Sequence, residues 1–242
     1  MVTTQDSQAT VASESAEVTP EPAEEIVVPP GDLYSDEPQL ESDLHLRQIL
    51  ALLTSLEWLW QDRQDFFASG NLTIYFSPQQ IKSQDFRGPD FFVVLDTERR
   101  TRKSWVVWEE GGKYPNLIIE VLSDSTAKAD KTTKKQVYQD IFRTPEYFWV
   151  DPVTAQLEGF VLMAGEYQAI EPNVHGHLHS RQLDLFLGIH ESQLRFFTPD
   201  GTLVPTPPEA AKSAEQQAEQ AQQRADRLAA RLREMGIDPD SE

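Results

Sequence analysis

The stretch PNLIIEVLSDSTAKADKTTKKQVYQDIFRTPEYFWVD, from Pro115 to Asp151, decides the fold. It begins with an apolar run at 117–119 that is rich in β-branched residues, which is typical of a strand buried on both faces. A charged segment with helical spacing follows, and a second apolar run at 147–150 closes the unit. A strand, a helix and a strand of these lengths favour two parallel neighbours joined by a crossover. We therefore expect an α/β fold.

Two carboxylates stand at the ends of apolar runs. Glu120 follows the first run, and Asp90 precedes another one at Phe91–Leu95. Open α/β sheets place functional sites at the carboxyl ends of central strands, and two convergent carboxylates suit a divalent cation such as Mg²⁺. In the alternative interpretation, Asp90 caps a turn and Glu120 pairs with a lysine, because an unpaired buried charge is costly. The spacing of the residues does not decide between these two interpretations.

The segment between the two strands offers cations. In a helix over 130–142, Asp130, Lys134 and Tyr138 recur every four residues and share one face, and Lys135 faces a neighbouring side. An ammonium group near Glu120 would relieve its charge and could hold an attacking water or a transition-state phosphate. The alternative is an ordinary Asp–Lys pair on a solvated face.

Composition sets the class of protein. A chain of 242 residues fits one domain with extensions. The absence of cysteine excludes disulfides and thiolate metal sites, which favours a reducing compartment. With no apolar run of membrane-spanning length and no secretory signal, we expect a cytoplasmic protein that has no membrane partner.

The net charge of −19 disfavours broad, sequence-independent binding to DNA. The charge is uneven, because residues 1–43 hold 11 acidic residues and no Lys or Arg. The remainder carries 29 acidic and 21 basic residues, a balance of −8. Local basic patches therefore remain compatible with the composition, and the short loop at 99–103 is basic.

Three regions are expected. Residues 1–36 are acidic, polar and rich in proline, which predicts disorder, and residues 37–203 form the α/β domain. Its first helix, at about 42–61, has apolar residues at three- and four-residue steps: Leu46, Ile49, Leu50, Leu53, Leu56 and Trp60.

A last helix is expected at 206–236, because Thr206, two prolines and Glu209 form a helix-start signature. Its apolar residues follow alternating four- and three-residue steps: Ala214, Ala218, Ala221, Ala225, Leu228, Leu232 and Met235. This heptad seam fits either a helix packed on the domain or a coiled coil joining protomers. Because half of the seam is alanine, it buries little area.

The central block also resembles a known family. Glu120-Val-Leu-Ser, followed by Asp130, Lys134, Tyr138 and the Val150-Asp151-Pro152 end, is similar to the Uma-two family, whose members are described as restriction endonucleases and are abundant in cyanobacteria. The family belongs to the PD-(D/E)xK nuclease superfamily. Gly88-Pro89-Asp90 resembles the Pro-Asp element of that superfamily, and the tail at 224–239 resembles those of cyanobacterial members.

The resemblance implies a restriction-endonuclease-like core, a mixed central sheet flanked by helices. In it Asp90 and Glu120 would bind Mg²⁺ or Mn²⁺. Leu122 occupies the superfamily's usual lysine position, and the family pattern points instead to Lys134 on the next helix. Glu41 and His45, near the first helix, are weaker candidates.

Two positions depart from the family pattern. Asp124 replaces a proline that is usual there, and Asn116 stands where aspartate is common. Asp124 adds negative charge beside the expected site. Neither departure removes the three main residues.

We therefore expect a Mg²⁺-dependent endodeoxyribonuclease. Asp90 and Glu120 hold the metal, Lys134 orients or activates water, and Asp130 and Tyr138 support the lysine, with Lys135 as the rival lysine. DNA is the expected substrate, and the seam at 214–235 favours a homodimer. The alternative is an inactive nuclease-like core that acts as an interaction module through its last helix.

A second cluster is weaker. His175, His177 and His179 alternate, so a strand would place them on one face where they could bind zinc. Gly176 argues instead for a turn.

Overall fold

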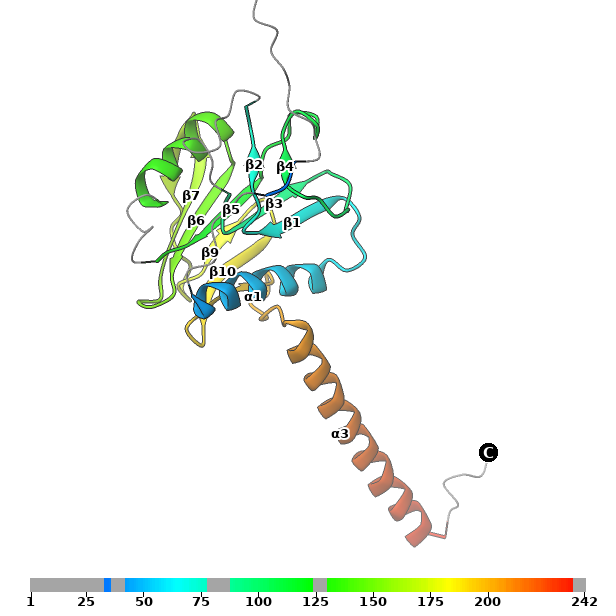
Figure 1. Ribbon diagram of the computed structural model, residues 1–242. Helices are drawn as coiled ribbons and strands as arrows, with labels where there is room; N and C mark the ends of the chain where they lie inside the picture. Colours follow the sequence, from blue (N-terminus) through cyan, green and yellow to red (C-terminus); the bar gives the residue numbers. More distant parts are fainter. Residues whose placement is uncertain (1–32, 36–41, 78–87, 124–129, 237–242) are drawn as a thin grey trace, which may run out of the picture.

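A mixed six-stranded sheet lies at the centre of the computed structural model, which describes residues 33–35, 42–77, 88–123 and 130–236 (Figure 1). Helices and smaller sheets cover its two faces. No helix in these ranges has the length and apolarity needed to span a membrane. In spatial order the strands are β1 (Phe66–Gly70), β3 (Phe91–Leu95), β5 (Leu117–Val121), β6 (Glu146–Asp151), β7 (Gln156–Met163) and β8 (Glu166–Ala169).

The expected crossover joins β5 to β6. These strands pair in parallel, with Leu117 opposite Glu146 and Val121 opposite Val150, as the sequence predicts. Every residue of β5 is buried, which matches its apolar, β-branched composition. The other neighbouring strands of this sheet pair antiparallel.

The connecting helix is wound differently from the prediction. Residues 130–142 are helical, but η1 (Asp130–Lys134) and η2 (Val137–Phe142) are π-helical. Such i→i+5 winding is rare and frequently occurs at functional sites. The segment ends at Arg143, which adopts a left-handed conformation with φ of 54° and donates its amide to the Tyr138 carbonyl.

One face of the sheet packs against α1 (Asp43–Leu59) and a three-stranded sheet of β9 (Leu178–Ser180), β10 (Leu185–His190) and β11 (Gln193–Phe197). The orientation predicted for α1 is partly wrong, since Leu46 and Leu50 are exposed. The inward face includes His45 and Gln48, whose side chain exchanges two 2.9 Å hydrogen bonds with the backbone of Leu194. These bonds allow an amide to replace a leucine in the core.

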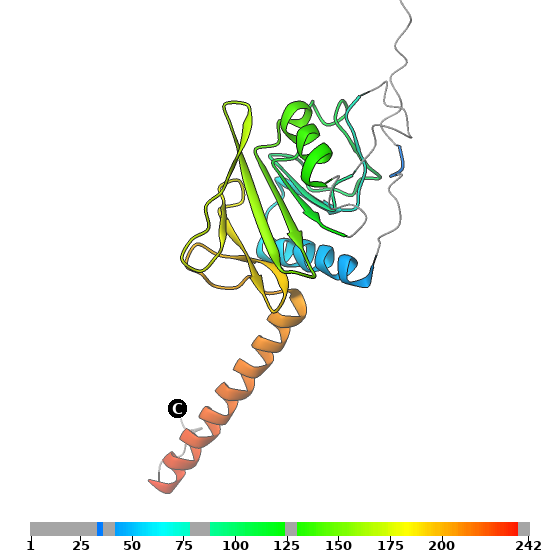
Figure 2. The same ribbon diagram turned by 90° about the vertical axis from the view of Figure 1, so that its left-hand side faces the viewer.

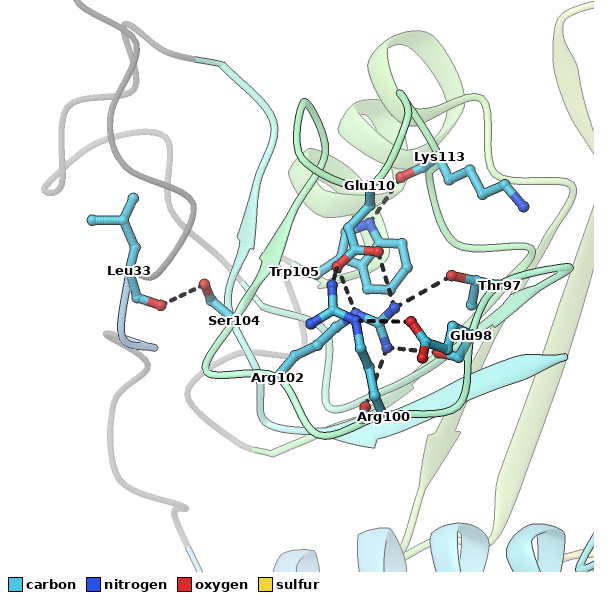
Figure 3. A network of polar contacts seen from close by, with 9 residues as sticks. All are labelled: Leu33, Thr97, Glu98, Arg100, Arg102, Ser104, Trp105, Glu110 and Lys113. Atoms are coloured by element: carbon cyan, nitrogen blue, oxygen red, sulfur yellow. Dashed lines mark hydrogen bonds and ion pairs between the residues drawn. The ribbon is translucent and has the colours of Figure 1, made fainter. Parts of the chain in front are cut away.

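The other face carries the crossover helix and the parallel pair of β2 (Ile74–Tyr75) and β4 (Trp105–Val106). Its core is largely aromatic: Phe67, Phe92, Trp105, Tyr138, Phe142, Tyr147, Trp149 and Phe160. Residues 33–35, inside the stretch predicted to be disordered, lie against this layer. There Tyr34 accepts a 2.9 Å hydrogen bond from the Tyr75 hydroxyl, and Leu33 accepts one from Ser104 (Figure 3).

The basic loop at 99–103 is held inside the domain. The guanidinium of Arg102 binds both oxygens of Glu110 at 2.6 and 2.9 Å (Figure 3). It also lies over the rings of Phe67 and Trp105. Arg100 contacts the same carboxylate at 2.9 Å. Arg99 donates to three carbonyls just after α1. The loop's arginines therefore serve packing and helix termination.

A buried carboxylate joins the central sheet to the smaller one. Glu146, at the start of β6, accepts hydrogen bonds from the Ser180 hydroxyl at 2.5 Å and the Arg181 amide at 2.7 Å. A third donor, the Gln182 amide, lies at 3.3 Å. Burial raises the pKa of Glu146, although these hydrogen bonds favour its charged form.

Replacement of Glu146 with alanine should destabilise the domain. It leaves the buried Ser180 hydroxyl and the part-buried amides of Arg181 and Gln182 without their acceptor, which we expect to cost about 3 kcal/mol of unfolding free energy. Urea denaturation measures this loss. Glu166→Ala, on the exposed strand β8, is the matched control and should change stability by less than about 0.5 kcal/mol. Equal effects of the two substitutions would contradict the anchoring role.

The last helix, α3 (Pro207–Glu234), projects away from the domain and buries none of its residues (Figures 1 and 2). The interpretation that packs it on the domain is therefore wrong. The capping box predicted from Thr206 and Glu209 is present. Glu209 also binds the buried Arg195 of β11 at 2.5 and 3.0 Å, and this hydrogen bonding lowers the pKa of Glu209 to about 2.

The contact between Glu209 and Arg195, which anchors α3 to the domain, should weaken in acid. The folded pKa of Glu209 lies at about 2, below its ordinary 4.5. Its stabilisation is therefore complete above about pH 4.5 and is lost as the pH falls toward 2. We expect Glu209→Gln to lower the melting temperature at pH 6 and to differ less from the wild type at pH 3. A difference that stays constant between these pH values would contradict this linkage.

Candidate functional site

The two predicted carboxylates face each other at one end of the sheet. β3 and β5 are antiparallel with Phe91 opposite Ile119, so Asp90 and Glu120 occupy the next pair of positions. The Val121 amide donates to Asp90 Oδ2 at 2.7 Å, and the Asp90 amide lies 3.4 Å from Glu120 Oε2. Each carboxylate is thus held by the backbone of the other's strand.

A glycine brings α1 to this end of the sheet. A Cβ at Gly70 would lie 2.2 Å from the Ile49 side chain and 3.0 Å from the Asp90 carbonyl, so only glycine permits this approach. One turn before Ile49, His45 Nε2 lies 3.1 Å from Asp90 Oδ1. His45, a weaker candidate in the sequence, therefore contacts one of the two main carboxylates.

The crossover helix covers Glu120 from the other side. The side chain of Glu120 is completely buried, and Lys134 Nζ lies 2.9 Å from its Oε2. The Tyr138 hydroxyl donates to Oε1 at 2.6 Å. Tyr138 was expected to support the lysine, but its hydrogen bond goes to the carboxylate itself. An ammonium and a phenol together satisfy a charge that would be costly alone.

The neighbouring lysine has a different environment. Lys135 Nζ lies 3.3 Å from the centre of the Phe160 ring, on strand β7, and burial lowers its pKa while Glu158 opposes that shift. It is therefore placed away from the two carboxylates. Of the two candidate lysines, the structure brings only Lys134 to Glu120.

The site favours an ionised Asp90. Burial alone would raise its pKa, but the hydrogen bond from His45 and the charges of Lys134 and His45 outweigh burial, so the pKa lies below its usual value. The pKa of Tyr138 is shifted well upward, because the phenol is buried and lies next to the Glu120 carboxylate. Tyr138 therefore keeps its proton at neutral pH and remains a hydrogen-bond donor.

Other predicted residues have different positions. Glu41, Asp124 and the side chain of Asp130 lie outside the described part of the chain. Asn116, at the start of β5, accepts from the Leu95 amide at 2.9 Å and donates to Gln182 at 3.0 Å, which is a structural role.

The alternating histidines do not form a metal cluster. His177 stacks on Phe197 at 4.1 Å between ring centres, and His179 packs on Phe186 at 4.7 Å. Over the whole described part of the chain, there is no group of three or more His, Cys, Asp or Glu side chains that could hold a metal. The main site therefore offers two carboxylates, one of which, Asp90, contacts the His45 imidazole. A metal bound there would need further ligands from water or substrate.

Removal of the lysine should destabilise the fold through Glu120. Lys134→Met leaves a buried carboxylate without its cation, which we expect to cost about 3 kcal/mol in urea unfolding. Glu120→Gln in the Lys134→Met background should restore much of this loss, since the amide keeps its hydrogen bond to Tyr138. If the double variant is no more stable than Lys134→Met alone, the ion pair does not carry the effect.

Comparison with known proteins identifies the family. The family described as "Uma2: Putative restriction endonuclease" matches residues 16–194. Among solved structures, the chain is similar to a "putative nuclease belonging to DUF820" from Anabaena variabilis ATCC 29413, with 14% sequence identity and a TM-score of 0.43. That match covers 61% of this chain and 76% of the other. No curated protein matches. Since the family match spans most of the chain, this protein belongs to the Uma2 family.

Proposed function

We propose that the protein is a Mg²⁺- or Mn²⁺-dependent endodeoxyribonuclease. One observation carries the proposal: Asp90, Glu120 and Lys134 come from three separate elements and meet at one end of the central sheet. Membership of a family described as restriction endonucleases supports the same reaction class. If Glu120 and Lys134 formed only a structural ion pair, no second carboxylate would be needed beside them.

The donor set fits a hard divalent cation. Each carboxylate oxygen has two lone pairs, so the oxygens of Asp90 and Glu120 can bind a metal while keeping their present hydrogen bonds. Mg²⁺ commonly uses one or two carboxylates and completes its shell with water and substrate phosphate. When bound, such an ion lowers the pKa of a coordinated water and stabilises the leaving oxygen.

The protein's own groups would have distinct tasks. Lys134 provides a positive charge beside Glu120, where it can hold an attacking water or a non-bridging phosphate oxygen. Tyr138 fixes the orientation of Glu120, and His45 fixes that of Asp90. Because Tyr138 stays protonated, it cannot serve as the base, and proton removal from water falls to a neighbouring group or to solvent.

A rival function is an inactive nuclease-like core that works as an interaction module. The exposed helix α3 favours it. The convergence of the two carboxylates and the lysine argues against it, since a protein that only binds partners has no need to gather these groups around one point. We therefore place catalysis first.

The test is DNA cleavage with a matched pair of variants. Purified protein is incubated with supercoiled plasmid and phage DNA in Mg²⁺ or Mn²⁺, with EDTA as the metal control. Glu120→Gln should abolish cleavage, because it removes a charged oxygen ligand while keeping a similar shape. Lys135→Met is the control and should keep activity, since that lysine lies over Phe160.

Calorimetry with Mn²⁺ gives a second readout, and near-UV circular dichroism verifies that both variants are folded. Metal binding by the wild type and by Lys135→Met, with none by Glu120→Gln, is the expected result. Cleavage that persists in Glu120→Gln would refute the assignment of this residue.

A further inference from the structure

The apolar seam of α3 has no partner within the described chain. Leu228 and Met235 are 53% and 73% exposed, and the helix buries none of its residues. At 1.5 Å per residue its 28 residues reach about 42 Å. We propose that this seam binds α3 of a second copy of the chain in an antiparallel two-helix coiled coil.

The order of residue sizes along the seam selects the antiparallel direction. The amino-terminal half of the seam is alanine, and its carboxyl-terminal half is Leu228, Leu232 and Met235. Reversed helices can align so that each large residue meets an alanine: Ala211 with the partner's Met235, Ala214 with the partner's Leu232, and Ala218 with the partner's Leu228.

The centre of this alignment places Ala221 opposite the partner's Ala225. Every layer except the two central ones then combines a small residue with a large one, so the helices keep a similar separation at both ends and their side chains interdigitate. A parallel pair would instead place alanine on alanine at one end and leucine on leucine at the other. Helices that pack closely at one end would be forced apart at the other.

Charge favours the same direction. Residues 209–220 carry three Glu and one Lys, whereas residues 221–234 carry four Arg against one Asp and one Glu. An antiparallel pair places the acidic half of each helix beside the basic half of the other. A parallel pair places like charge beside like charge, which is unfavourable.

The attachment of α3 to the domain suits such a pair. Glu209 and Arg195 fix the first turn of the helix against β11. In the antiparallel alignment the partner's Met235 lies level with Ala211, near the base of the domain where α1 lies (Figures 1 and 2).

Sedimentation velocity on the full-length protein tests whether the pair forms. We expect a concentration-dependent equilibrium between monomer and dimer. Leu228→Glu should weaken the dimer by at least about tenfold, since it removes a buried leucine. Gln223→Glu, on the opposite side of the helix, adds the same charge outside the seam and should leave the equilibrium unchanged.

Disulfide cross-linking tests the direction, and the chain has no native cysteine. A mixture of Ala221→Cys and Ala225→Cys, one with a mass tag, should form the mixed dimer on oxidation, because these positions face each other. Ala221→Cys alone should cross-link poorly, because a disulfide needs Cα atoms within about 7 Å.

Two results would overturn the proposal. One is a protein that sediments as a monomer at every concentration. This result would overturn the proposal even if α3 were found to contact added DNA. The other is Ala221→Cys alone cross-linking as efficiently as the mixture, which would indicate a parallel pair. Neither measurement depends on nuclease activity, so the pairing and the proposed function can fail separately.

Discussion

A carboxylate buried without solvent access constrains the rest of this structure. Glu120 lies near the carboxyl end of β5, an interior strand of the central sheet, and is completely buried. A charge in such a place requires an opposite charge and hydrogen-bond donors. Lys134 and Tyr138 supply them from the crossover helix. The position of that helix, and with it one whole layer of the fold, is therefore tied to a single side chain.

The two parallel strands show two uses of a buried carboxylate. Glu146 begins β6 and Glu120 lies near the end of β5, so they stand at opposite ends of the sheet. Glu146 is surrounded by Ser180 and backbone amides, which join two sheets. Glu120 instead faces an ammonium group and a second carboxylate. Only the second environment resembles a site for hydrolysis of a charged substrate.

Parts of this arrangement could be predicted because they depend on local sequence. The run at 117–121 is apolar and β-branched, and the length of the crossover implies parallel pairing, so β5 and β6 could be placed. The resemblance to the family singled out Lys134. The capping box of α3 was likewise readable, since it involves residues three apart.

The remaining features depend on tertiary contacts. The first helix was expected to turn Leu46 and Leu50 inward, but His45 and Gln48 take the inward face because Asp90 and Leu194 offer them polar partners. Strand β1, with the sequence FFASG, has too little alternation to be recognised and is stabilised by its pairing with β3.

The winding of the crossover helix has a consequence for how such a site can be lost. Lys134 and Lys135 are chemically identical neighbours, and their different roles come only from the direction in which the backbone turns them. Residues of an ordinary α-helix are about 100° apart around the axis. A change in winding by a single residue would rotate one ammonium group away from Glu120 without altering any residue of the site. Relatives could therefore lose the contact between the lysine and the buried carboxylate while still carrying every side chain that a sequence comparison would look for.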